Sequence, residues 1–183
     1  MKAIIIGGGI GGLSTALSLH HAGIDVRVFE SVKDPAAVGA GINLQPNAVR
    51  ELFEMGLGDA LLATGVATHR WSVYNKHGQL IWSEPRGLDA GYKWPQISIH
   101  RGHLLLLMLE ATRRAIGEAN VRTGHHLAGF EQDANGVTAH FIDRTSGNAL
   151  CTERGDLLIG ADGIHSAVRK NFYPNEGPIH YSG

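Results

Sequence analysis

A run of glycines directly after the first apolar segment is the feature that most constrains how this chain can fold. Residues 2–13 read KAIIIGGGIGGL, which places Gly7, Gly9 and Gly12 in a G-x-G-x-x-G pattern. Glycine is a costly choice inside a helix or strand because it loses the most backbone freedom on folding. The pattern therefore indicates a turn at which side chains must be absent, for packing or for the approach of a ligand.

The surrounding residues predict a strand, a helix and a second strand. Residues 3–6 are apolar and mostly β-branched, which is typical of a buried strand in a parallel sheet. Residues 10–22 have the spacing of a helix that ends at Gly23, and residues 24–30 alternate as a second strand. A unit of this length is typical of a βαβ crossover.

In that setting the glycines form the fingerprint of a dinucleotide-binding turn. Gly7 allows the tight turn, Gly9 allows a pyrophosphate to approach the backbone, and Gly12 allows the helix to pack closely on the strand. The N–H groups at the start of the helix are available to the phosphates. Glu30 ends the second strand, where the fingerprint places a carboxylate that binds ribose hydroxyls.

The rest of the chain alternates between helical and extended patterns. We expect a loop at 31–41, helices at 46–55, 104–116 and 164–172, a hairpin at 71–82, an irregular stretch at 83–95, and strands at 127–132, 137–142, 149–152 and 156–160. The sequence therefore predicts an α/β fold.

Composition excludes several classes of function. Hydrophobic residues make up 43% of the chain and charged residues 18%, as in ordinary globular domains. The net charge of −1 gives no electrostatic case for binding nucleic acid or an acidic membrane. The apolar run Leu104–Leu109 is too short to span a membrane. Cys151 is the only cysteine, so no internal disulfide can form, which fits the reducing cytoplasm.

The histidines do not form a metal-binding pattern. His20 and His21, and likewise His125 and His126, are adjacent pairs whose side chains point in different directions in a helix or a strand. Ser166 does not stand in a G-x-S-x-G nucleophile elbow. We therefore predict no metal site and assign no catalytic residue.

A second glycine-containing segment indicates the cofactor. Residues 156–169 read DLLIGADGIHSAVR and resemble the G-A-D-G-x-x-S-x-V-R segment of the single-component FAD-dependent aromatic monooxygenases. In that family the segment is a strand-to-helix turn that supports the FAD pyrophosphate and the nicotinamide donor. The resemblance implies that Asp162 accepts hydrogen bonds from a ribose or orients an arginine.

Two more segments carry the same resemblance. Residues 39–48, GAGINLQPNA, resemble the family loop whose backbone, at Gly41 and Ile42, borders the isoalloxazine ring. Residues 98–104, SIHRGHL, resemble the segment that begins a helix with an arginine, so Arg101 would contact the FAD phosphate and ribityl region. An arginine at a helix start is unfavourable against the helix dipole unless an anion offsets it, which independently favours a nearby phosphate.

With residues 82–87 and 121–124 the resemblance covers nearly the whole chain, and within the family it is closest to the phenazine hydroxylases. The cofactor-binding residues that it implies are Gly7, Gly9, Ile10, Gly11, Gly12, Glu30, Ser31, Gly41, Ile42, Arg101, Leu127 and Asp162.

The implied fold is a three-layer, Rossmann-like FAD-binding domain with a parallel sheet and an added antiparallel β-meander, plus the first strands of a substrate-binding sheet. We expect the FAD-binding βαβ part at 1–70, the first strands of the substrate domain at 71–99, a return to the FAD-binding domain at 100–173 and the start of a truncated substrate domain at 174–183. Family members continue into a second flavin signature, a Gly-Asp-Ala stretch that this chain lacks. We therefore expect the N-terminal part of an enzyme, inactive alone.

The implied activity is hydroxylation of a small aromatic molecule. FAD is reduced by NADH or NADPH, O2 adds to give a flavin C4a-hydroperoxide, and the hydroperoxide transfers a hydroxyl group to the ring. The cofactor carries the oxygen chemistry, and the protein supplies positioning and excludes water. The substrate, the choice of NADH or NADPH and the oligomeric state stay open.

Two other interpretations also stay open. The chain could be a non-catalytic fragment that binds FAD or another nucleotide. It could instead be an NAD-dependent oxidoreductase, although the second motif and Arg101 would then be unexplained. The absorption spectrum of the purified protein reveals a bound flavin. It therefore distinguishes a flavoprotein from an NAD-binding protein and from a protein without a cofactor.

Overall fold

The computed structural model describes residues 1–178 and divides the chain into two compact units. Unit 1 consists of residues 1–35 and 109–178, and unit 2 consists of residues 36–108. The longest helix, α4 (Arg101–Ile116), begins in unit 2 and ends in unit 1. The last five residues of the predicted segment 174–183 lie outside the described residues.

Unit 1 contains the predicted parallel sheet, in the strand order β12-β1-β2-β8. Its strands are β1 (Lys2–Ile6), β2 (Asp25–Phe29), β8 (Val121–Arg122) and β12 (Leu157–Gly160). Helix α1 (Ile10–His21) packs on β1 and β2 through its buried residues, among them Leu13 and Leu17. The predicted βαβ unit and the mixed α/β fold are confirmed.

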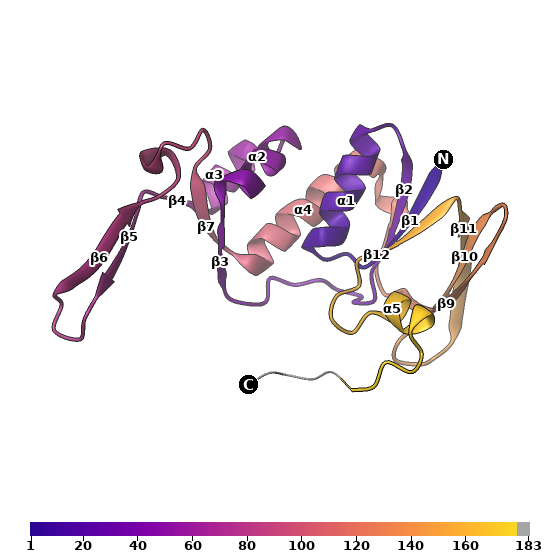
Figure 1. The fold of residues 1–183 in the computed structure, drawn as a ribbon. Helices are drawn as coiled ribbons and strands as arrows, with labels where there is room; N and C mark the ends of the chain where they lie inside the picture. Colours follow the sequence, from indigo (N-terminus) through magenta and orange to yellow (C-terminus); the bar gives the residue numbers. More distant parts are fainter. Residues whose placement is uncertain (179–183) are drawn as a thin grey trace. The chain divides into compact units, whose positions relative to one another are not determined.

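An antiparallel meander covers the opposite face of this sheet (Figure 1). Its strands are β9 (His126–Asp133), β10 (Gly136–Ile142) and β11 (Ala149–Gly155). The rings of Phe29 from β2 and Phe141 from β10 stack with centroids 4.0 Å apart, and Ile4 and Ile6 complete the same cluster. Burial of this apolar cluster joins the two sheets.

Unit 2 is built on a small antiparallel sheet in the order β3-β7-β4. Its elements are β3 (Gly41–Leu44), α2 (Pro46–Glu54), α3 (Gly58–Thr64), β4 (Val66–Thr68), the hairpin β5 (Arg70–Tyr74) and β6 (Leu80–Pro85), a 3-10 turn (Gly87–Ala90) and β7 (Gln96–His100). Ile97 and Ile99 of β7 are buried, as are Val49 and Leu61 of the two helices. Helix α2 and the hairpin were expected; the three strands of the small sheet and α3 were not.

Two helix boundaries differ from those expected from the apolar pattern. Helix α4 begins at Arg101 rather than Leu104, directly after strand β7, in agreement with the resemblance that places this arginine at a helix start. Helix α5 (Ala167–Phe172) begins three residues after Ile164, because Ser166 is its N-cap and accepts a hydrogen bond from Arg169 N at 2.9 Å. A short 3-10 turn, Glu118–Asn120, precedes β8.

One buried charge ties the meander to the parallel sheet. Glu153 of β11 is only 7% exposed and accepts hydrogen bonds from Lys2 Nζ and from Arg27 Nη1, the latter at 2.7 Å. Burial raises the pKa of Glu153, but the hydrogen bonds and charges of the two cations outweigh it and hold the pKa below its usual value. The carboxylate is therefore charged and links strands of two sheets.

We expect Glu153→Gln to lower the free energy of unfolding by about 1–3 kcal/mol at neutral pH, because Lys2 and Arg27 lose their counter-charge. Since the folded-state pKa is the lower one, this contribution is complete above the unfolded-state pKa of about 4.5 and is lost as the pH falls through the folded-state pKa. Urea unfolding at several pH values measures the difference, which should close in acid. Glu131→Gln, which changes an 86% exposed carboxylate, is the control.

Candidate functional site

The two glycine-rich turns lie side by side in unit 1. Strand β1 lies between β2 and β12. The chain continues from β1 to β2 on one side, and much later in the sequence it adds β12 on the other side. Ligands of open α/β sheets bind outside the carboxyl ends of strands at such a switch point. Here Ala161 N, in the turn after β12, donates to Ile6 O at 2.7 Å. The predicted nucleotide turn therefore stands at the position that this fold uses for ligands.

Gly7 and Gly12 are required by the protein's own packing. Gly7 has φ +105°, and a Cβ atom on it would lie 2.4 Å from Ala161 O. A Cβ on Gly12 would lie 1.9 Å from Gly7 O, so the first turn of α1 packs directly on the glycine turn. These two positions explain why the loop and the helix can approach each other.

Packing within the protein does not explain why positions 9 and 11 are glycines. A Cβ atom on either would meet no protein atom within 4 Å. Gly9 has φ −75° and ψ 178°, which any residue can adopt. It precedes α1, whose first turn has no side-chain cap and no acidic residue. Ile10, the first helical residue, is half-buried. The open helix amino end and the space beside it fit an anionic group such as a pyrophosphate.

The carboxylate of Glu30 is held beside the glycine turn. Glu30 Oε2 accepts a hydrogen bond from Gly8 N at 2.6 Å, and Oε1 accepts from Val32 N at 2.7 Å and from Ser31 Oγ at 3.2 Å. A carboxylate can accept about four hydrogen bonds, and Glu30 already accepts three, so capacity is left for one ribose hydroxyl. Gly8 was not predicted as a site residue, yet its N–H orients Glu30 and a Cβ on it would lie 3.0 Å from the Glu30 Cβ.

Asp162 caps the helix that follows it. Its carboxylate accepts hydrogen bonds from Ser166 Oγ and Ala167 N, both at 2.6 Å, and from Val168 N at 3.1 Å. The described contacts of Asp162 therefore hold the second turn in shape. The side chain of Leu127 is buried in the core between the two sheets, which leaves only its main chain for contact with a ligand.

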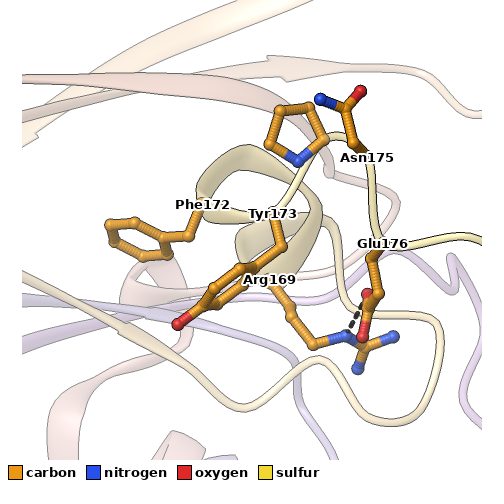
Figure 2. A pocket seen from close by; sticks show the side chains of 6 residues that line it. Arg169, Phe172, Tyr173, Asn175 and Glu176 are labelled. Carbon is orange, nitrogen blue, oxygen red and sulfur yellow. Dashed lines mark hydrogen bonds and ion pairs between the residues drawn. The ribbon is translucent and has the colours of Figure 1, made fainter.

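Arg169, on the helix that follows, also contacts this turn. Figure 2 shows its side chain beside Glu176, with Arg169 Nε donating to Glu176 Oε2 at 2.7 Å, in a hollow that Phe172 and Tyr173 also line. Its Nη2 donates to Ile164 O at 2.8 Å. The last residue of the second motif thus ties the turn to the segment after α5, a role that the sequence alone did not indicate.

The other predicted residues lie in unit 2. Gly41 and Ile42 are on β3, an edge strand, so main-chain groups on its outer side are free for a ligand within this sheet. Arg101 N donates to Ala40 O at 3.0 Å, and its exposed guanidinium has no hydrogen-bond partner among the described residues of unit 2. Gly39 lies beside this side chain and has φ +118°, a conformation that favours glycine.

The described residues show neither a metal centre nor a membrane span. No group of three or more His, Cys, Asp or Glu side chains gathers in residues 1–178 in a way that could hold a metal ion. No helix in that part of the chain is both long and apolar enough to cross a bilayer.

Sequence comparisons agree with this geometry. Residues 1–177 match the family model described as FAD binding domain. The phenazine 1,6-dicarboxylic acid hydroxylase PhzS of Lysobacter antibioticus is 45% identical over 173 residues, which are 94% of this chain and 42% of that protein. The FAD-dependent urate hydroxylase of Klebsiella pneumoniae is 36% identical over 183 residues, 92% of this chain and 42% of that protein. The chain spans less than half the length of these relatives.

Solved structures share the fold. The structure of Klebsiella pneumoniae HpxO complexed with FAD and uric acid has a TM-score of 0.75 and 35% identity, and covers 93% of this chain and 41% of that one. The p-nitrophenol 4-monooxygenase PnpA of Pseudomonas putida DLL-E4 has a TM-score of 0.80, covers 93% of this chain and 42% of its own, and at 24% identity supports the fold alone.

Gly9 and Gly12 differ in their packing, so alanine at these two positions should affect stability and FAD binding differently. We expect Gly9→Ala to keep the free energy of unfolding within about 1 kcal/mol, because its Cβ meets no protein atom, and to weaken FAD binding roughly tenfold or more. Gly12→Ala should destabilise the fold by about 3 kcal/mol or more through the clash with Gly7 O. Urea unfolding and flavin fluorescence titration measure the two effects. Unchanged FAD affinity in Gly9→Ala would contradict the pyrophosphate assignment.

Proposed function

The chain belongs to the FAD-binding domain family of flavin-dependent aromatic hydroxylases, and from that premise we propose that it is part of a monooxygenase that hydroxylates a small aromatic molecule. NADH or NADPH supplies the electrons and O2 the oxygen atom. The relatives named above act on a phenazine dicarboxylic acid and on urate, both planar ring systems, so we propose a planar aromatic or heteroaromatic substrate here.

The observation that carries the proposal is the uncapped start of α1 beside the fixed carboxylate of Glu30. A Cβ atom at position 9 or 11 would meet no atom of the described residues of unit 1 within 4 Å, which suits the approach of the FAD pyrophosphate. Glu30 stands where an adenosine ribose can donate to it. The residues present therefore fit the adenosine diphosphate half of FAD.

Residues of unit 2 supply different contacts. We propose that the guanidinium of Arg101, which has no partner among the described residues of unit 2, binds a phosphate or ribityl oxygen of FAD. We also propose that main-chain groups of Gly41 and Ile42 bind the edge of the isoalloxazine ring. When bound, FAD supplies the redox and oxygen chemistry. The chain's own residues bind and orient it, which agrees with the lack of an assigned catalytic acid or base.

The hairpin β5–β6 exposes apolar side chains that fit a further part of the proposal. Trp71 and Trp82 are each at least half exposed, and the register, which pairs Trp71 with Glu84 and Val73 with Trp82, puts both on the same face of the hairpin. Exposed apolar side chains on one face suit a surface that another segment or partner covers. We propose that residues 71–99 are the first strands of a substrate domain. We also propose that the enzyme works in the cytoplasm, where the one cysteine of this chain, Cys151, would stay reduced.

The absorption spectrum of the purified chain, with and without added FAD, tests the cofactor. We expect the two visible bands of an oxidised flavin, and bleaching of those bands by NADH or NADPH under anaerobic conditions in the longer enzyme. Binding of NAD without flavin would instead support an NAD-dependent oxidoreductase. Bound FAD without any NAD(P)H oxidation in the longer enzyme would support a non-catalytic FAD-binding protein.

Arg101→Lys gives a second test of the cofactor site. We expect FAD affinity to fall by an amount equivalent to about 1–3 kcal/mol, because lysine lacks the planar pair of donors that can bind two phosphate oxygens. The free energy of unfolding should not change, since the guanidinium has no partner in unit 2. Arg50→Lys, an exposed arginine of the same unit, is the control. Equal FAD affinity in both variants would remove Arg101 from the site.

A further inference from the structure

One face of the small sheet in unit 2 carries polar side chains that the proposed cofactor contacts do not use. Ile97 and Ile99 of β7 are buried in the core of the unit, so the intervening residues Ser98 and His100 belong to the opposite face. Asn43 of β3 is the register partner of Ser98. The described residues around this face form a hollow lined by Gly41, Asn43, Val66, Ser98, His100 and His103, among others.

A chain of hydrogen bonds crosses this face and fixes the orientation of Asn43. Ser98 Oγ donates to Asn43 Oδ1 at 2.6 Å. Because Ser98 has one hydroxyl hydrogen, the 2.8 Å contact between the hydroxyls of Thr68 and Ser98 must be donated by Thr68. The carbonyl oxygen of Asn43 therefore faces Ser98 and accepts its hydrogen bond. Its amide nitrogen, on an exposed residue, has no partner among the described residues of unit 2 and keeps two donor hydrogens.

One histidine, His103, extends the donor surface, and His100 packs beside it. His100 Nε2 donates to Gly39 O at 2.9 Å, which uses that N–H, and its Nδ1 is buried and has no partner among the described residues. The ring of His103, on the first turn of α4, lies with its centroid 4.8 Å from that of His100 and is exposed. None of the described residues that line the hollow is acidic. The hollow thus presents hydrogen-bond donors, with apolar surface from Val66 and Ile42.

We propose that this hollow binds the carboxylate of an aromatic acid, with Asn43 Nδ2 and His103 donating to its oxygens. The proposal rests on the proposed function, because the acid would be the substrate or a substrate-like ligand of the monooxygenase. Amide and imidazole donors suit a carboxylate, and the absence of acidic lining residues avoids like-charge repulsion. Ser98 and Thr68 are positioning residues, since they act on the ligand through Asn43.

The experiment titrates the 183-residue chain with 1-naphthoate, and with 1-naphthamide as an uncharged ligand of the same shape. Both titrations are run with and without saturating FAD, and are followed by NMR of the Asn43 side-chain amide and the His103 ring. We expect the acid, and not the amide, to shift both signals.

Three variants separate ligand contact from positioning. Asn43→Asp keeps an acceptor for Ser98 but places a negative charge in the hollow, and should weaken naphthoate binding at least roughly tenfold. Ser98→Ala frees the Asn43 amide to rotate and should cause a smaller loss, about threefold. Ser72→Ala removes a hydroxyl that bonds Ser83 at 2.9 Å in the hairpin of the same unit, and should leave binding unchanged. Thermal unfolding confirms that each variant folds.

Several results would overturn the inference. Equal binding of acid and amide, no binding of the acid, or unchanged naphthoate affinity in Asn43→Asp would each do so. If FAD alone produced the full shift of the Asn43 and His103 signals and the acid added nothing, the hollow would belong to the flavin ring. Normal FAD binding together with any of these results would leave the proposed function standing, whereas failure to bind FAD would count against that function separately.

Discussion

The direct contact between two main-chain turns at the carboxyl ends of β1 and β12 is the constraint on which the rest of unit 1 depends. Gly7 must have a positive φ angle and must lack a side chain, because Ala161 O occupies the position of its Cβ. Gly12 must lack one because the helix start lies against Gly7 O. Only this close packing brings the open end of α1, the Glu30 carboxylate and the second motif to one edge of the sheet.

Polar contacts around that edge serve two separate purposes. Glu30 is oriented by Gly8 N and Val32 N but retains capacity for a ligand. Asp162 likewise accepts three hydrogen bonds, all of them from Ser166 and the first turn of α5. In the described structure its side chain therefore maintains the shape of the second turn.

Sequence patterns predicted the elements that are long or carry an unambiguous local signal. The βαβ unit, the meander and the hairpin β5–β6 were of this kind, because apolar periodicity and glycine turns specify them locally. The strands β3, β4, β7 and β8 were not predicted. Each has two to five residues, and such short strands form only because partner strands supply their hydrogen bonds.

The sequence by itself indicated where side chains are absent, since the glycines at positions 7 and 12 form a recognisable pattern without knowledge of the fold. It also determined the class of ligand, because the two motifs and Arg101 were readable in order along the chain. Only the tertiary structure decided which partners the polar groups take: Glu153 with Lys2 and Arg27, and Ser98 with Asn43. Hydrogen bonds and ion pairs require atoms within about 3 Å, and residues far apart in the chain reach that distance only when the sheets assemble.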